Sequence, residues 1–276
     1  MTNREEQRKG RETAVNVQAA QTAEAAQAAK TIQAALREKA VAVTGLSKSY
    51  SGKKVIENLN LTIRTGQIYG LLGANGAGKS TAVECILGTR RSDSGEVRIL
   101  GLDPVTERRH LFEQVGVQFQ EASYPDRIKV RELCEETACL YEKTADYRDL
   151  LRQFKLEDKA DSMLSQLSGG QKQRLFIILA LIPGPRVVFL DELTTGLDTK
   201  SRREVWKCLL EMKDKGLSIC LVSHFMDEVE MLCDQIGILR DGMFVFEGTV
   251  KEAVDNSPYS NLEDAYLWWT QEEENR

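Results

Sequence analysis

A glycine-rich segment in the first third of the chain has the residue types and spacing of a phosphate-binding loop. It reads Gly-Ala-Asn-Gly-Ala-Gly-Lys-Ser over residues 73–80, between an apolar run typical of a strand and a segment that predicts a helix over 80–88. Glycines let backbone N–H groups surround phosphate oxygens, and the start of the following helix adds positive potential. We expect Lys79 to contact the β and γ phosphates and Ser80 to offer its hydroxyl to Mg²⁺. The expected nucleotide contacts are the loop and the next residue: Gly73, Ala74, Asn75, Gly76, Ala77, Gly78, Lys79, Ser80 and Thr81.

Two adjacent carboxylates, Asp191 and Glu192, follow the apolar run at 187–190. Parallel strands deliver such residues to the sheet edge at which ligands bind. Asp191 suits a Mg²⁺ ligand that acts through water, and Glu192 suits the group that polarises an attacking water. Acidic residues after a strand are also common as helix caps, and the phosphate loop in the same chain favours the catalytic interpretation.

A third segment, Leu-Ser-Gly-Gly-Gln at residues 167–171, discriminates best between classes of phosphate-loop protein. With it, the chain resembles the ATP-binding subunit of an ABC transporter over about residues 41–250. A serine and two glycines at a helix start form a second anion cradle. The resemblance implies that this cradle closes on ATP held by the other subunit of a dimer, with contacts in trans from Ser168, Gly169, Gly170, Gln171 and Asp198.

The same resemblance assigns roles to several isolated residues. Tyr50 corresponds to the aromatic residue that stacks on adenine, and His224 to the switch histidine that contacts the γ-phosphate. Gln120 corresponds to the glutamine that senses Mg²⁺ and the attacking water, with Gln118 as a nearby rival for that position. The implied catalytic residues are Glu192, His224 and Gln120, and the implied metal ligands are Ser80, Gln120 and Asp191.

One residue departs from the family pattern, and the tail indicates a subgroup. Leu193 stands where the family usually has proline, which loosens a fixed φ at the turn without removing a catalytic atom. The segments at 246–249 and 262–267 are similar to the ends of ABC-2-type exporter ATPases, the drug-resistance group. The alternative interpretation of this tail is a terminal amphipathic helix without any meaning for the subgroup.

The elements that must position these residues follow from apolar runs that alternate with turns. We expect an α/β fold of the P-loop NTPase, ABC ATPase type. The resemblance implies a RecA-like core of mostly parallel strands, an antiparallel β subdomain and a helical insertion at about 121–185. Residues 1–40 form an Ala/Gln-rich leader, helical or disordered, residues 41–250 the ATP-binding domain, and residues 251–276 a helical tail. Strands are predicted at 41–43, 59–63, 67–72, 95–100, 115–119, 186–190 and 218–222, and further helices at 131–141, 170–181 and 200–215.

Composition excludes several classes of function. The 37 basic and 42 acidic residues give a net charge of −5, which provides no broad cationic face for nucleic acid. The six cysteines form no Cys-x-x-Cys pair, and the two histidines do not cluster with them as a zinc site requires. The longest apolar run, at 175–182, is too short to span a bilayer, and the first residues lack the pattern of a secretory signal.

These observations predict a subunit that binds and hydrolyses ATP and powers a membrane ABC transporter, of the ABC-2 exporter type, by ATP-driven dimerisation of two nucleotide-binding subunits. We expect no membrane-spanning segment in the chain itself. Its cofactors are ATP and Mg²⁺, and its partners are a second ATP-binding subunit, expected to be a copy of this chain, and separate transmembrane permease subunits. It is expected on the cytoplasmic face of the cell membrane, held there by the permease. The alternative is an ABC ATPase that acts on ribosomes or DNA, although such relatives carry two nucleotide folds or long coiled coils. A small-molecule kinase would leave residues 167–171 unexplained.

Overall fold

The computed structural model describes residues 39–119, 124–194 and 196–270. The leader predicted at 1–40 therefore lies almost entirely outside the described residues, as do Gln120 and the last six residues of the predicted tail. The described part begins with a strand at Lys39, and Ala40 is fully buried.

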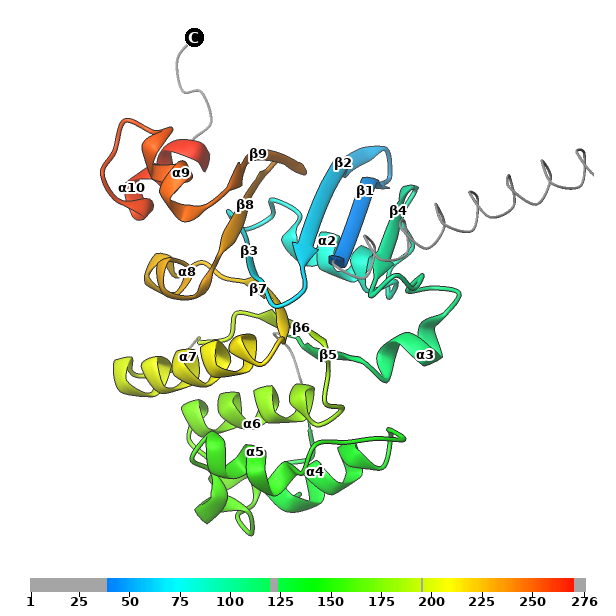
Figure 1. Cartoon of the computed structure of the whole chain (residues 1–276), viewed down its shortest axis with the longest axis vertical. Helices are drawn as coiled ribbons and strands as arrows, with labels where there is room; N and C mark the ends of the chain where they lie inside the picture. Colours follow the sequence, from blue (N-terminus) through cyan, green and yellow to red (C-terminus); the bar gives the residue numbers. More distant parts are fainter. Residues whose placement is uncertain (1–38, 120–123, 195, 271–276) are drawn as a thin grey trace, which may run out of the picture. The chain divides into compact units, whose positions relative to one another are not determined.

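A six-stranded sheet forms the centre of the fold (Figure 1). Its order is β5-β6-β7-β3-β8-β9, and all neighbours pair in parallel except β9, which runs antiparallel to β8. This arrangement confirms the mostly parallel core, and it brings the carboxyl ends of β3, β5, β6 and β7 to one edge. The strands are β3 (Ile68–Gly73), β5 (Val115–Gln118), β6 (Val187–Asp191), β7 (Ser218–Val222), β8 (Gln235–Arg240) and β9 (Met243–Gly248).

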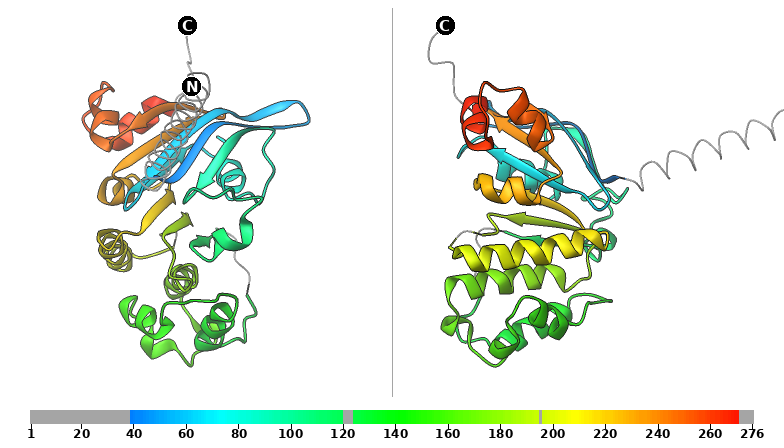
Figure 2. Two further views of the ribbon diagram at one scale, coloured as in Figure 1. Left: turned by 45° about the vertical axis from the view of Figure 1, so that its right-hand side comes forward. Right: turned by 60° about the vertical axis from the view of Figure 1, so that its left-hand side comes forward.

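The central strands are apolar along their whole length because both faces of the sheet are covered. Successive residues point to opposite faces, so Val188 and Leu190 pack into one core while Val187 and Phe189 pack into the other. The first core contains α6 (Gly169–Leu181) and α7 (Thr199–Asp214), which lie side by side in Figures 1 and 2.

The second core joins the central sheet to α2 (Lys79–Ile86) and to a three-stranded antiparallel sheet. That sheet has the order β2-β1-β4, from β1 (Lys39–Tyr50), β2 (Lys53–Arg64) and β4 (Ser94–Ile99). The expected antiparallel subdomain is confirmed, and its first two strands are longer than the predicted 41–43 and 59–63. The apolar pattern understated them because their outer face carries polar residues and bulges interrupt the register.

Short helices occupy the region between β5 and β6. They are α4 (Val130–Ala138), α5 (Tyr147–Gln153) and two single-turn 3₁₀ helices at Glu157–Lys159 and Leu164–Gln166. A further short helix, α3 (Arg108–Phe112), precedes β5. Helices α4 and α5 pack against α6 on the side away from the central sheet (Figure 1). This is the expected helical subdomain, and α6 joins it to the sheet core.

The described chain closes with α8 (Met226–Leu232), α9 (Val250–Asp255) and α10 (Leu262–Thr270). These helices enclose a third, smaller core with β8, in which Ala253 and Leu262 are fully buried. Within the described ranges, no helix is both long and apolar enough to cross a membrane.

Candidate functional site

The phosphate loop joins β3 to α2, and its glycines are required by the backbone. Gly73 and Gly78 have φ of 153° and 106°, in the region that side chains rarely adopt. A Cβ on Gly73 would lie 2.5 Å from the carbonyl oxygen of Leu239, and one on Gly78 would lie 2.7 Å from that of Val55. The loop is therefore held by close contact with the backbone of β2 and β8.

Lys79, at the start of α2, points its ammonium back into the loop. Its Nζ donates to the carbonyl oxygens of Gly73 at 2.7 Å and Ala74 at 3.1 Å. Burial lowers the pKa of Lys79, and the carboxylates of Asp191 and Glu192 oppose this shift. A cation in this position can serve phosphate oxygens that approach the loop.

Asp191 and Glu192 lie at the end of β6, where the sheet pairing with β7 finishes. Burial raises the pKa of Asp191, the charge of Glu192 adds to that shift, and Lys79 opposes it. Glu192 has a φ of 49°, and its N–H donates to the carbonyl oxygen of Val222 at 2.9 Å. The strand end therefore turns Glu192 away from the regular strand geometry while keeping its backbone paired.

Gln118, the rival of Gln120 for the Mg²⁺-sensing position, is hydrogen-bonded at both ends of its amide. Gln118 is buried, its Nε2 donates to the carbonyl oxygen of Phe119 at 2.9 Å, and its Oε1 accepts from the N–H of Asp191 at 3.2 Å. The Oε1 end of the amide therefore joins the end of β5 to the end of β6, and the Nε2 end bonds the next residue of its own segment. Gln120 lies outside the described residues, so its role stays a prediction.

Oxygen donors suitable for Mg²⁺ come from two elements, the Ser80 hydroxyl on α2 and the Asp191 carboxylate on β6. Mg²⁺ is ordinarily bound by one or two carboxylates together with substrate phosphates. Within the described part of the chain, no group of three or more His, Cys, Asp or Glu side chains could hold a metal ion by itself. The donor set therefore fits a Mg²⁺ ion that arrives with a nucleotide.

His224 follows β7 and faces Glu192. Its Nδ1 lies 3.6 Å from Glu192 Oε1, and its imidazole ring packs on Phe225 with ring centroids 4.1 Å apart. The side chain is 46% exposed, which leaves the imidazole accessible from solvent. The structure therefore brings the predicted switch histidine and the predicted catalytic carboxylate together at the ends of neighbouring strands.

Tyr50 ends β1 and is 38% exposed. Lys48 Nζ and Arg90 Cζ each lie 5.4 Å from the centroid of its ring. These cations orient the ring by cation–π attraction. An accessible aromatic ring held in this way can provide a stacking surface.

The segment at 168–171 begins α6 as a capping box. The N–H of Gln171 donates to Ser168 Oγ at 3.3 Å, and the N–H of Ser168 donates to Gln171 Oε1 at 2.9 Å. Ser168 and Gly169 are exposed, and a Cβ on Gly169 would meet no atom of the described residues within 4 Å. This helix start is therefore ordered by its own residues and open on one side.

Asp198 caps α7. Its Oδ1 accepts from the N–H groups of Lys200 and Ser201 at 3.0 Å each, and its Oδ2 accepts from Ser201 Oγ at 2.6 Å. The hydrogen bonds from Ser201 chiefly lower the pKa of Asp198. The sequence had suggested only a contact in trans, and the structure shows a capping role within the chain.

Leu193 lies in the core beside α6 and α7 and is fully buried. A proline at this position would restrict the backbone of Glu192 to extended conformations. Leucine places no such restriction on Glu192, whose φ is 49°. The departure from the family pattern therefore adds a buried apolar side chain to the core, and it is compatible with the positive φ of Glu192.

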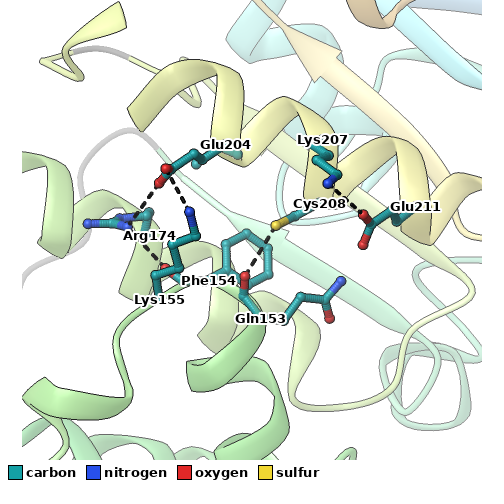
Figure 3. A pocket seen from close by; sticks show the side chains of 9 residues that line it. Gln153, Phe154, Lys155, Arg174, Glu204, Lys207, Cys208 and Glu211 are labelled. Carbon is teal, nitrogen blue, oxygen red and sulfur yellow. Dashed lines mark hydrogen bonds and ion pairs between the residues drawn. The ribbon is translucent and has the colours of Figure 1, made fainter. Parts of the chain in front are cut away.

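A separate cavity of about 150 Å³ lies between the end of α5 and α7 (Figure 3). Lys155 Nζ lies 2.7 Å from Glu204 Oε1, and Arg174 Nη1 donates to the carbonyl oxygen of Phe154 at 3.1 Å (Figure 3). None of its lining residues belongs to the phosphate loop or to the carboxylate pair. These contacts connect the helical subdomain to α6 and α7.

Known proteins resemble this chain in both sequence and structure. The family model described as ABC transporter matches residues 56–195. The Nod factor export ATP-binding protein I of Burkholderia lata (strain ATCC 17760 / DSM 23089 / LMG 22485 / NCIMB 9086 / R18194 / 383) is 36% identical over 217 residues, covering 76% of this chain and 71% of that protein. The protein of the same name from Rhizobium meliloti (strain 1021) is 39% identical over 222 residues, covering 78% of this chain and 66% of that protein.

Solved structures give the same result for the fold. The structure of an ATP-binding subunit of an ABC transporter aligns with a TM-score of 0.77 at 26% identity, covering 84% of this chain and 99% of that one. A dimeric bacterial ABC transporter cassette aligns with a TM-score of 0.67 at 24% identity, covering 76% and 98%. The predicted fold class and family are thus confirmed, and the ribosome, DNA and kinase alternatives are not favoured. The chain belongs to the ABC transporter family, as one of its ATP-binding, ATP-hydrolysing domains.

Proposed function

We propose that this chain is the ATPase subunit of an ABC-2-type exporter and that it works as a pair of copies on separate transmembrane subunits. The observation that carries the proposal is the contrast between two parts of the site. The phosphate loop, the carboxylates and His224 gather at the ends of β3, β6 and β7, while the start of α6 is open to solvent. The names of the two relatives, both export ATP-binding proteins, support the direction of transport.

The residues of the loop would bind the triphosphate. Backbone N–H groups of 73–80 surround its oxygens, Lys79 moves from the Gly73 and Ala74 carbonyls to the β and γ phosphates, and Thr81 adds a further contact. Tyr50 would stack on the adenine. Mg²⁺, held by Ser80, Asp191 and Gln120 when ATP is bound, would neutralise part of the phosphate charge.

Hydrolysis would use the pair that the structure places 3.6 Å apart. Glu192 orients and polarises the attacking water, and His224 contacts the γ-phosphate and stabilises the charge that develops on it. A second copy supplies Ser168, Gly169, Gly170 and Gln171 to the same phosphate, with Asp198 beside them. Loss of the γ-phosphate removes the negative charge that joins the two copies, so the pair opens.

The open face of α6 is the reason to expect a pair. A symmetric pair would place the start of α6 of each copy against the phosphate loop of the other, an isologous interface. Membrane attachment on the cytoplasmic side would come through the transmembrane subunits, which would also contact the exported molecule.

The first test is a comparison of the parent chain with Glu192→Gln. This variant should bind ATP with unchanged affinity, lose hydrolysis by about 100-fold or more, and accumulate as an ATP-dependent dimer. Light scattering gives the molecular mass with and without Mg-ATP, and phosphate release gives the rate. Glu263→Gln, on the exposed face of α10, is the matched control and should behave as the parent.

Hydrolysis by Glu192→Gln at the parent rate would refute the role of Glu192. A chain that stays monomeric with ATP in both forms would refute the paired mechanism. Copurification with ribosomes instead of a membrane protein from detergent extracts would refute the transporter assignment.

A further inference from the structure

Glu228, on α8, is a buried carboxylate with no part in the site described so far. It is 0% exposed, its Oε2 accepts from Ser223 Oγ at 2.6 Å, and its Oε1 accepts from Trp206 Nε1 at 3.1 Å. Burial raises its pKa, and the hydroxyl and indole donors oppose that shift. Burying a carboxylate costs free energy even when donors surround it, so the position calls for an explanation beyond packing.

The first donor ties Glu228 to the residues on either side of His224. Ser223 directly precedes the histidine, and Ser223 Oγ also accepts from the N–H of Phe225 at 3.1 Å. The ring of Phe225 packs against the imidazole of His224, and the guanidinium carbon of Arg202 lies 4.6 Å from the centroid of the Phe225 ring. Both neighbours of His224 are thus fixed by a network whose buried end is the Glu228 carboxylate.

The second connection runs to the segment that follows Glu192. Thr194 is fully buried, and its hydroxyl has no well-formed hydrogen bond to any of the described residues. Its hydroxyl is one of the groups that lower the pKa of Glu228, after the hydroxyl of Ser223 and the indole of Trp206. Trp206, the other donor, lies on α7, so the carboxylate of Glu228 joins the segment after β7 to α7.

We propose that Glu228 is a positioning residue that fixes the segment carrying His224 against α7, so that the imidazole meets Glu192 and the γ-phosphate in the right place. In this proposal the carboxylate does not contact the nucleotide but acts through Ser223 on the neighbouring His224. This inference rests on the proposed function, because it requires His224 to act in hydrolysis.

If Glu228 has this role, the substitution Glu228→Gln should slow ATP turnover without weakening ATP binding. The amide has the same shape but no charge, and with its oxygen facing the Trp206 indole its NH₂ group must donate to Ser223 Oγ, which reverses the hydrogen bond that Ser223 makes to the carboxylate. We expect kcat of the full chain to fall by about 10- to 100-fold while the KM for ATP and its dissociation constant change by less than about twofold. Glu230→Gln, an exposed glutamate on the same helix, is the matched control and should retain the parent kcat.

Ser223→Ala provides a second variant if Glu228→Gln does not fold. It removes the hydroxyl that joins the Glu228 carboxylate to the segment carrying His224, and it should lower kcat while leaving the KM for ATP unchanged. A matched fall in ATP affinity and kcat, together with a lower melting temperature, would indicate a purely structural role and would overturn the inference.

A double-mutant cycle with His224→Ala decides whether the effect passes through the histidine. If it does, Glu228→Gln should change kcat by less than about twofold in the His224→Ala background. An equal loss in both backgrounds would overturn this inference while leaving the proposed function intact. Parent-like turnover of His224→Ala alone would overturn the proposed role of the histidine, and this inference with it.

Discussion

The phosphate loop and the start of α6 are both glycine-rich helix starts, yet they are built in opposite ways. Gly73 and Gly78 of the loop approach the backbone of β8 and β2, so distant parts of the sequence define its shape. The start of α6 is ordered by two hydrogen bonds between Ser168 and Gln171, three residues apart. The phosphate loop is therefore packed against its own chain at Gly73 and Gly78, whereas the start of α6 is exposed to solvent.

Under the proposed function, the contrast accounts for a single chain that binds ATP and a pair of chains that hydrolyses it. Packing around the loop pre-organises the backbone donors before the nucleotide arrives, which reduces the entropic cost of binding. An exposed capping box contributes nothing to that arrangement in the same chain. Substitutions at the two glycine clusters should therefore have different consequences.

The largest effect is expected from a methyl group in the loop. In Gly78→Ala, the Cβ would lie 2.7 Å from the carbonyl oxygen of Val55 at a φ of 106°, so the backbone must shift. We expect a loss of about 2–4 kcal/mol in the free energy of unfolding and a loss of ATP binding. Urea denaturation and calorimetric titration with ATP measure the two quantities.

Gly76→Ala is the control for that substitution. Gly76 also has a positive φ, 83°, but a Cβ there would meet no atom of the described residues within 4 Å. It should cost only the conformational strain, about 1 kcal/mol. Equal losses in the two variants would show that close packing does not define the loop.

The sequence predicted best those features that a local segment encodes. The glycine spacing at 73–80 predicts directly that the backbone there has positive φ angles, as it does. An apolar strand that is followed by Asp191 and Glu192 predicts that these carboxylates lie at the edge of a parallel sheet. Capping by Asp198 could also have been foreseen, since aspartate before a helix is a frequent cap.

The roles of Gln118 and Glu228 could not be predicted in this way. Gln118 accepts from the backbone of residue 191, and Glu228 accepts from Trp206 on a different helix, at sequence separations of 73 and 22. Such contacts depend on how helices and strands pack, and neither side chain carries a local pattern that distinguishes it from an exposed polar residue.

An intermediate effect, confined to hydrolysis, is expected at the open helix start. Gly169→Asp places a side chain into open space at the first residue of α6, where a carboxylate suits the helix dipole. The free energy of unfolding should change by less than about 0.5 kcal/mol, and ATP should bind the monomer as before. Hydrolysis should fall by about tenfold or more, because the carboxylate would repel the γ-phosphate of the partner's ATP.

Gly169→Ala separates charge from size at the same position. The methyl group adds no charge and should reduce the rate less than the aspartate does. Unchanged hydrolysis in Gly169→Asp, measured by phosphate release at saturating ATP, would contradict the assignment of this helix start to the second half of the site.

The smallest effect is expected where the helical subdomain meets α7. Lys155 and Glu204 form an ion pair at 2.7 Å, but their side chains are 64% and 26% exposed, and water screens such pairs. Glu204→Gln should lower the free energy of unfolding by less than about 1 kcal/mol and leave the ATP affinity unchanged. Urea denaturation at low and high salt would check it, and the difference from the parent should shrink as salt rises. Arg174 Nη1, on a side chain that is only 13% exposed, also lies 3.9 Å from Glu204 Oε2. A loss of stability as large as that of Gly78→Ala would mean that Arg174 needs the charge of Glu204. It would also mean that the contact between the helical subdomain and α7 stabilises the fold as much as the packing of the phosphate loop does.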